Sequence, residues 1–193
     1  LNKMVVRELV YENGEVLKDL LYGIRMQNDL AQTAVIRTGE PDFHNILLSA
    51  QDTDGYYIDF GFLKTNVQAI GTMYKIVDIE KFIEDTSYRK FPELDLNAGF
   101  AVYDELNNST SEFTLKFREG KYSFENGIGN ADIVTEMLLS DFSALVMGSA
   151  EYAGLYRTGA AKVRECRGET GRMVRTLDTI LHVQQKPFTN TDY

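Results

Sequence analysis

The stretch SEFTLKFREGKYSFENG, residues 111–127, decides the fold of the second half of this chain. Phe113, Leu115 and Phe117 alternate with polar residues, and a period of two is typical of a strand that buries one face. The REGKY segment at 118–122 has the composition of a tight reversal. The two halves of the stretch are therefore predicted to pair as a β-hairpin.

Further strands and helices are predicted on both sides of this hairpin. The expected strands are TMYKIVDI at 72–79, LNAGFAVYDEL at 96–106 and ADIVTEM at 131–137. The expected helices are 78–88, with Asp78 as its N-cap, 138–156, broken at Gly148, and 171–183. This mixture predicts an α+β region in which helices cover an antiparallel sheet.

The first part of the chain has a different order of elements. KMVVRELVY at 3–11 and QTAVIR at 32–37 read as strands, and EVLKDLLYGIRMQ at 15–27 has the apolar spacing of an amphipathic helix. EPDFHNILLSA at 40–50 is predicted as a second helix with Pro41 in its first turn. The β-α-β-α order is typical of an α/β layer. The glycine-containing residues 51–71 are predicted as the loop that leads into the second region.

Composition narrows the class of protein. The 193 residues are 44% hydrophobic and 25% charged, which is ordinary for a globular protein. No run of 18 apolar residues occurs and no signal peptide opens the chain, so we expect no membrane span and a cytoplasmic location. The single cysteine, Cys166, allows no internal disulfide and fits a reducing compartment. The net charge of −9 disfavours nucleic acid and would suit a cationic amine substrate.

Few motifs of known chemistry are present. The sequence has no glycine-rich phosphate loop and no paired-cysteine zinc pattern, so no metal site is predicted. His44 and His182 are far apart and each falls in a predicted helix, which favours a surface or capping role. GIGNAD at 127–132 leads into a strand and not into a helix N-terminus, so phosphate binding is not predicted there. These residues alone predict an α/β plus α+β protein, and they do not indicate a function.

Three segments occur in order around the predicted strands: GTMYKIVDIEKFIED at 71–85, LLSDFSALVMGS at 138–149 and GLYRTGAA at 154–161. Together they resemble the sterol-carrier-protein-2-like C-terminal domain of the Eis (enhanced intracellular survival) family of acetyltransferases. Residues 5–47 are similar to the closing half of that family's second, degenerate GNAT-like domain. The resemblance covers essentially the whole chain. It implies a partial GNAT-like α/β layer at 1–68 and a sterol-carrier-like domain with a C-terminal tail at 69–193.

The resemblance also gives a role to the C-terminal KPFTNTDY, residues 186–193. Chains of the family end with a Pro-Phe pair and a terminal aromatic residue, matched here by Pro187, Phe188 and Tyr193, although that terminal residue is usually Phe. In the family the C-terminus reaches back into the active site of the N-terminal acetyltransferase domain, where its α-carboxylate is the general base. The resemblance implies this catalytic role for Tyr193, attraction of a cationic amine for Asp192, and tail anchoring for Pro187 and Phe188.

The resemblance implies that this chain corresponds to only the C-terminal part of such an enzyme. The acetyl-CoA domain and its tyrosine general acid precede the matched part, and the chain begins at Leu1 and not at Met, so we expect a piece of a longer polypeptide. Acetyl-CoA is expected to bind that longer protein and not these 193 residues. The expected partners are the N-terminal acetyltransferase domain and a small amine substrate, with homo-oligomerisation left open.

Two alternatives come from other functional classes. The first is a module that holds an apolar ligand between helix and sheet, which the aromatic stretch from Phe113 to Phe124 favours. The second is a scaffold that only mediates assembly. A ligand-sized apolar cavity in the second region would favour the first alternative over the acetyltransferase and the scaffold.

Overall fold

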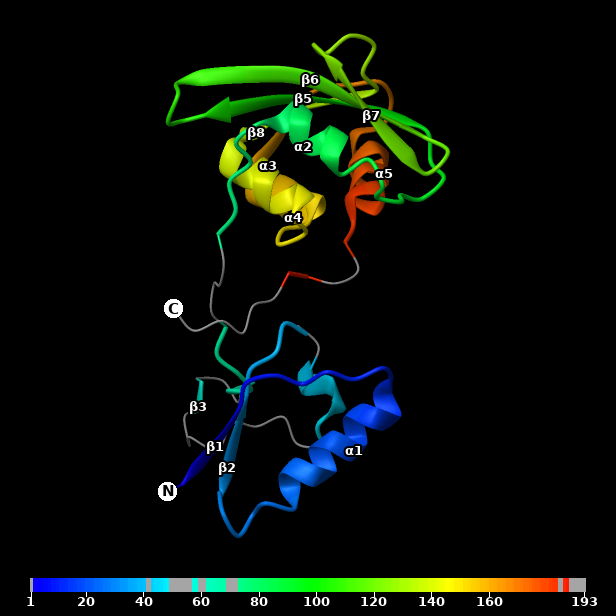
Figure 1. Cartoon of the computed structure of the whole chain (residues 1–193). Coiled ribbons are helices and arrows are strands. Elements are labelled where there is room, and N and C mark those ends of the chain that lie inside the picture. The colour runs from blue at the N-terminus through cyan, green and yellow to red at the C-terminus, as the bar shows by residue number, and fades with distance from the viewer. Residues whose placement is uncertain are drawn as a thin grey trace. The chain divides into compact units, whose positions relative to one another are not determined.

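The computed structural model describes residues 2–40, 43–48, 57–58, 62–68, 73–183 and 186–187. These residues form two compact units, one within 2–68 and the other within 73–187 (Figure 1). The predicted boundary between residues 68 and 69 borders residues 69–72, which lie outside the described part, so this boundary stays a prediction. Within the described ranges, every helix is too short or too polar to span a lipid bilayer.

The first unit begins with the predicted β-α-β arrangement. Strands β1 (Lys3–Val6) and β2 (Thr33–Ile36) pair in parallel, with helix α1 (Gly14–Arg25) between them in the chain. The side chain of Asn13 caps α1, because its Oδ1 accepts hydrogen bonds from the backbone N–H groups of Glu15 and Val16, each at 3.0 Å. The local sequence therefore specifies the start of the helix.

The prediction of a helix at 40–50 was wrong for the residues that the structure describes there, 40 and 43–48. Residues 43–48 contain only one 3-10 turn, η1 (Phe43–Ile46), and Pro41 lies outside the described part. Ile46, Leu47 and Leu48 follow one another directly and are all exposed, and consecutive positions cannot share one helix face. The predicted loop contains two short antiparallel strands, β3 (Tyr57–Ile58) and β4 (Phe62–Leu63).

The second unit contains a five-stranded sheet in the order β7-β6-β5-β8-β9. The strands are β5 (Leu96–Asp104), β6 (Ser109–Arg118), β7 (Lys121–Asn126), β8 (Ile133–Leu138) and β9 (Ala161–Cys166). The β6–β7 hairpin is confirmed, with Leu115 opposite Phe124 and positive φ angles of 51° at Glu119 and 71° at Gly120 in the turn.

The α+β class is confirmed, but the sheet is not wholly antiparallel. Strand β8 pairs with β5 in parallel, whereas the other three neighbouring pairs are antiparallel. The parallel pairing of β8 with β5 arises because the chain leaves β7 at one edge of the sheet and crosses to the far side of β5 through residues 127–132. This crossover lies on the face opposite the helices, where Thr114 Oγ1 donates to the carbonyl of Gly127 at 2.8 Å.

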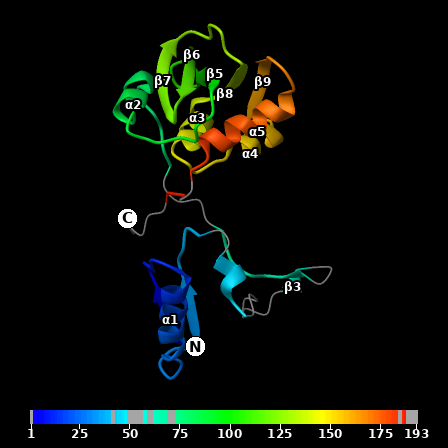
Figure 2. The same cartoon turned by 90° about the vertical axis from the view of Figure 1, so that its right-hand side faces the viewer.

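Helices cover one face of this sheet, and residues 127–132 cross part of the other face, which carries no helix and which we call the open face (Figures 1 and 2). They are α2 (Ile79–Asp85), α3 (Leu139–Val146), α4 (Tyr152–Thr158) and α5 (Thr170–Leu181). Asp78 caps α2 as predicted, accepting from the N–H of Lys81 at 3.0 Å. The core lies between sheet and helices, and Phe100, Phe113, Phe142 and Leu177 are among its fully buried members.

Two other predictions for the second region differ from the structure. Residues 73–78 form no strand; the N–H of Ile76 instead donates to Ser143 Oγ on α3 at 3.1 Å, and Val77 is exposed. Strand β9 was missed because its Lys162, Arg164 and Glu165 give a charged stretch, although Ala161 and Val163 pack inward. In both cases the tertiary neighbours, and not the local pattern, decide the outcome.

Candidate functional site

The predicted site residues at the C-terminus are only partly within the described structure. Phe188, Asp192 and Tyr193 lie outside the described residues, so their roles stay predictions. Lys186 and Pro187 are described. The root of the C-terminal segment, which we define as residues 181–183 and 186–187, is therefore the part of this candidate site that the structure describes.

Helix α5 fixes where the C-terminal segment starts. The helix buries Val174, Leu177, Ile180 and Leu181, which recur at helical spacing on one face. The helix ends at Leu181, and the next residue, His182, has an extended backbone (φ −60°, ψ 128°) that turns the chain away from the helix axis. The segment therefore leaves from a helix end that the core holds in place.

The turn between α3 and α4 contacts this root directly. Gly148 has φ 81°, and a Cβ built on it would lie 2.7 Å from the Cβ of Val183. No side chain of any other residue type fits there without displacing Val183 or the turn. The predicted helix break at Gly148 is confirmed, but its contact with Val183 was not visible in the sequence.

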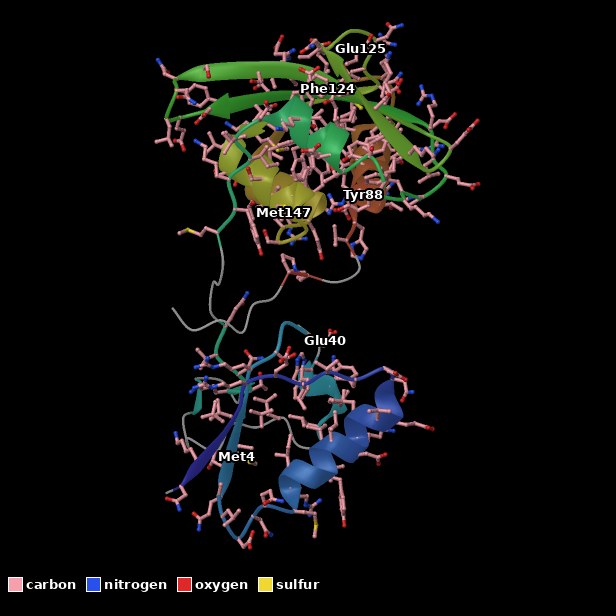
Figure 3. The ribbon with its side chains drawn as sticks, viewed as in Figure 1. Met4, Glu40, Tyr88, Phe124, Glu125 and Met147 are labelled. Atoms are coloured by element: carbon pink, nitrogen blue, oxygen red, sulfur yellow. The ribbon has the colours of Figure 1, made fainter. Side chains whose placement is uncertain are left out.

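A second contact follows after a few residues. Lys186 Nζ lies 3.8 Å from Glu151 Oε1, and Glu151 is the N-cap residue of α4. Pro187 comes next, and its ring restricts φ. In Figure 3, Met147, which directly precedes the turn glycine, lies on the helix side of the sheet, whereas Glu125 lies on the opposite side. The C-terminal segment thus leaves the unit from its helical layer.

The space between sheet and helices is filled by the protein's own aromatic rings. Phe142 lies edge-on to Phe100 and to Phe113, with ring centroids 5.4 Å apart in both pairs. Phe100 and Phe113 stack at 5.6 Å, and Phe124 stacks on Phe113 at 5.3 Å. Such contacts are typical of a close-packed core. An apolar ligand in this position would have to displace them.

One buried polar pair lies in the same interior. The hydroxyls of Thr135 on β8 and Tyr152 on α4 are 2.6 Å apart, and both residues are almost completely buried. Burial raises the pKa of Tyr152 to about 12. Each hydroxyl satisfies the other, so the pair links helix to sheet without leaving an unpaired polar group.

Stability should fall between pH 10 and pH 12 because of Tyr152. The unfolded phenol loses its proton near pH 10, whereas the folded one keeps it to about pH 12, so the unfolded state binds fewer protons in this range. The slope from this residue should reach about 1.4 kcal/mol per pH unit. We expect Tyr152→Phe to remove this slope and the exposed Tyr156→Phe to retain it, in urea denaturation at a series of pH values. Equal slopes in both variants would contradict the assignment.

The open face of the sheet carries a shallow groove of about 860 Å³. Arg164 Nη1 lies 2.9 Å from Glu112 Oε1 and 3.6 Å from Glu136 Oε1 within it. Burial, and secondarily the charge of Glu105, raises the pKa of Asp141 at its edge. Opposite charges therefore pair across the groove, and this face lacks the basic surface that nucleic acid requires.

The first unit offers a helix N-terminus after a strand, which is the usual position for a diphosphate. In α1, however, Asn13 Oδ1 already accepts from the first free N–H groups, and Glu15 places a carboxylate in the first turn. Both features oppose an anionic ligand. The residues at the start of α1 therefore do not fit the pyrophosphate of acetyl-CoA.

The histidines and the cysteine provide no further centre. His182 is exposed at the end of α5, whereas His44 in η1 is half-buried, with no hydrogen-bond partner for its Nδ1 within the described residues. Cys166 ends β9 and is a partly exposed free thiol. In the part of the chain that the structure describes, no group of three or more His, Cys, Asp or Glu residues could hold a metal ion.

Comparison with protein families gives a match over more than half of the chain. A family model described as "Sterol carrier protein domain" matches residues 79–190. These residues comprise all the helices and strands of the second unit. Among curated proteins, a sequence search found no match.

Solved structures resemble a larger part of the chain. Eis1 from Mycobacterium abscessus is 15% identical with a TM-score of 0.60, over 99% of this chain and 43% of its own. A GCN5-related N-acetyltransferase from Kribbella flavida is 16% identical with a TM-score of 0.57, over 94% and 42%. A protein of unknown function from Enterococcus faecalis V583, described as a probable N-acyltransferase, is 13% identical with a TM-score of 0.60, over 96% and 42%. At these identities the likeness concerns the fold, and this chain spans less than half of each of these proteins.

Proposed function

This chain belongs to the sterol carrier protein domain family, and because its fold resembles acetyltransferase structures beyond that domain, we propose that it is the C-terminal part of an acetyl-CoA-dependent N-acetyltransferase. The substrate would be a primary amine. This chain would supply structural support and one catalytic group, and the N-terminal acetyltransferase domain would be its main partner. We place the protein in the cytoplasm, in keeping with its single free cysteine.

The observation that carries this proposal is the extent of the likeness in fold. The sterol carrier match begins at residue 79, whereas the likeness to the protein from Mycobacterium abscessus covers nearly the entire chain. A module that consisted of a sterol carrier domain alone would not need the parallel β1-α1-β2 unit. The combination of both units is what an acetyltransferase of this architecture would contain.

The exposed apolar side chains of the first unit support a larger assembly. Among its described residues only Leu17 is buried, while Val5 and Val35, paired on one face of the two strands, are 51% and 41% exposed. Parallel sheets are covered on both faces in folded proteins. We therefore expect a further part of the longer protein to cover this face.

The proposed chemistry assigns one proton transfer to this chain. As the neutral amine nitrogen bonds to the acetyl carbon, the bond from that carbon to the sulfur of coenzyme A would break, and the α-carboxylate of Tyr193 would take the proton that the nitrogen loses. The thiolate of coenzyme A would leave and take a proton from the tyrosine general acid expected in the N-terminal domain. A free terminal carboxylate has a pKa of about 3.5, so burial in the assembled site must raise this pKa for efficient transfer near neutral pH. Asp192 would attract the cationic form of the amine before it reacts.

We expect the isolated 193-residue chain to show no micromolar binding of acetyl-CoA in calorimetric titration. The reason is that Asn13 and Glu15 make the start of α1 unsuitable for pyrophosphate, and the acetyl-CoA domain is expected to precede this chain. The longer protein serves as the positive control and should bind acetyl-CoA under the same conditions. Micromolar binding to the isolated chain would contradict this division of roles.

A second candidate function is binding of an apolar ligand, which membership in the sterol carrier family favours. The stretch from Phe113 to Phe124 supplies many of the apolar side chains that such a site would need. However, Phe113 and its neighbours Phe100 and Phe142 contact one another and are fully buried. The acetyltransferase proposal does not require this interior to open, and we therefore prefer it.

A further inference from the structure

We propose that the turn between α3 and α4, residues 147–151, is a clamp that positions the C-terminal segment of the chain. This inference rests on the function proposed above, in which that segment carries the general base. The clamp has two contacts: Gly148 against Val183, and Glu151 paired with Lys186. These four residues are positioning residues, since none of them is assigned a contact with substrate.

The first contact is steric. The site of a Cβ on Gly148 lies within 2.9 Å of the Cβ and both Cγ atoms of Val183, so the missing side chain is the space that Val183 needs. Gly148 itself is buried, and Leu181, two residues before Val183, belongs to the core. The chain therefore cannot shift toward the turn after it leaves α5.

The turn is held on both sides and can serve as a fixed support. On the α3 side, Arg89 Nη1 donates to the carbonyl of Val146 at 2.7 Å, and the N–H of Ser149 donates to the carbonyl of Ala144 at 2.9 Å. On the α4 side, Asp178 of α5 accepts from the N–H of Ala153 at 2.8 Å. This last bond connects the turn to the helix from which the C-terminal segment departs.

The second contact is electrostatic and lies further along the segment. Lys186 pairs with Glu151 at the opposite end of the turn from Gly148, so two points of one rigid turn hold two points of the segment. Two fixed points define a direction, and Pro187 continues it with a restricted φ. A general base requires such control, because a misplacement of about 1 Å can cost about a hundredfold in rate.

The test compares Gly148→Ala with Gly159→Ala. Both glycines follow a helix and have φ 81°, but a Cβ on Gly159 would meet no atom within 4 Å. Both variants therefore bear the same backbone strain, and only Gly148→Ala displaces Val183. We expect the hydrogen-bonded backbone amides in the last turn of α5, residues 178–181, to exchange hydrogen about fivefold faster in Gly148→Ala than in Gly159→Ala, measured on the 193-residue chain.

The same pair is then compared in the longer acetyltransferase. Gly148→Ala should lower kcat about tenfold relative to Gly159→Ala, with KM for acetyl-CoA unchanged, because it displaces the base without altering the acetyl-CoA domain. Equal exchange rates and equal kcat values in the two variants would overturn the clamp.

A charge exchange tests the second contact without a change in packing. Glu151→Lys and Lys186→Glu should each lower kcat by about two- to fivefold, which is the range expected for an exposed ion pair. The double variant should recover the wild-type kcat, whereas Glu165→Lys on the open sheet face should have no effect. Failure of the double variant to recover activity would count against the clamp.

If the longer protein transferred no acetyl group at all, the proposed function would fail, but the hydrogen-exchange comparison would still decide whether the clamp exists.

Discussion

Deleting Tyr193 from the longer acetyltransferase that we propose is expected to lower kcat about a hundredfold. The deletion moves the α-carboxylate back by one residue, which is roughly 3.5 Å of extended chain. A general base must lie within hydrogen-bond reach of the proton that it takes, and this displacement exceeds that reach. Steady-state kinetics with a primary amine and acetyl-CoA would measure the effect.

Two matched variants separate the carboxylate from the ring. One glycine added after Tyr193 moves the carboxylate forward by a similar distance, so its kcat should fall about as far as in the deletion. Tyr193→Phe keeps the carboxylate in place and should change kcat little. An unchanged kcat in the deletion would mean that the terminus is not the base, and the assignment of Tyr193 would have to be abandoned.

Much of the second unit could be predicted from local sequence. The alternation of Phe113, Leu115 and Phe117 predicts β6, and Asp78 predicts the start of α2, because in both cases the signal lies within a few neighbouring residues. Gly148 likewise predicts the end of α3. Local patterns of this kind are reliable when the residue itself, through its conformation or its capping bond, causes the structural feature.

The features that were missed depend on residues far apart in the chain. Residues 73–78 have strand-forming side chains, but they pair with no strand of the sheet, and the N–H of Ile76 donates to Ser143 Oγ on α3 instead. Strand β8 runs parallel to β5 because residues 127–132 cross from β7 to the far side of β5, and no local pattern in the sequence indicates this crossing. The same holds for the contact of Gly148 with Val183. The role predicted for the C-terminal residues, in contrast, rests on family resemblance, and the clamp that we propose for them rests on contacts between residues far apart in the chain.

Replacing Phe142 by alanine should lower the free energy of unfolding by about 3–5 kcal/mol. The ring is completely buried and contacts Phe100 and Phe113 edge-on, so its removal loses both the transfer free energy of the side chain and the aromatic contacts around the cavity that remains. Urea denaturation followed by far-UV circular dichroism would measure the loss, since the chain contains no tryptophan. Phe124→Ala is the matched control, because this ring also stacks on Phe113 but is only partly buried, and the loss should be clearly smaller.

The size of this loss also decides between the two candidate functions. A close-packed interior predicts the full loss for Phe142→Ala and no stabilisation of the wild-type chain by a long-chain fatty acid, because a ligand that does not bind the native state cannot shift its stability. An apolar-ligand module predicts the reverse: a loosely packed interior in which Phe142→Ala costs less than about 1 kcal/mol, and a wild-type melting temperature that rises with fatty-acid concentration. The contacts of Phe142 with Phe100 and Phe113 lead us to expect the first result. In that case the sterol carrier fold of this chain would act as a packed support for the C-terminal segment, and not as a container for a lipid.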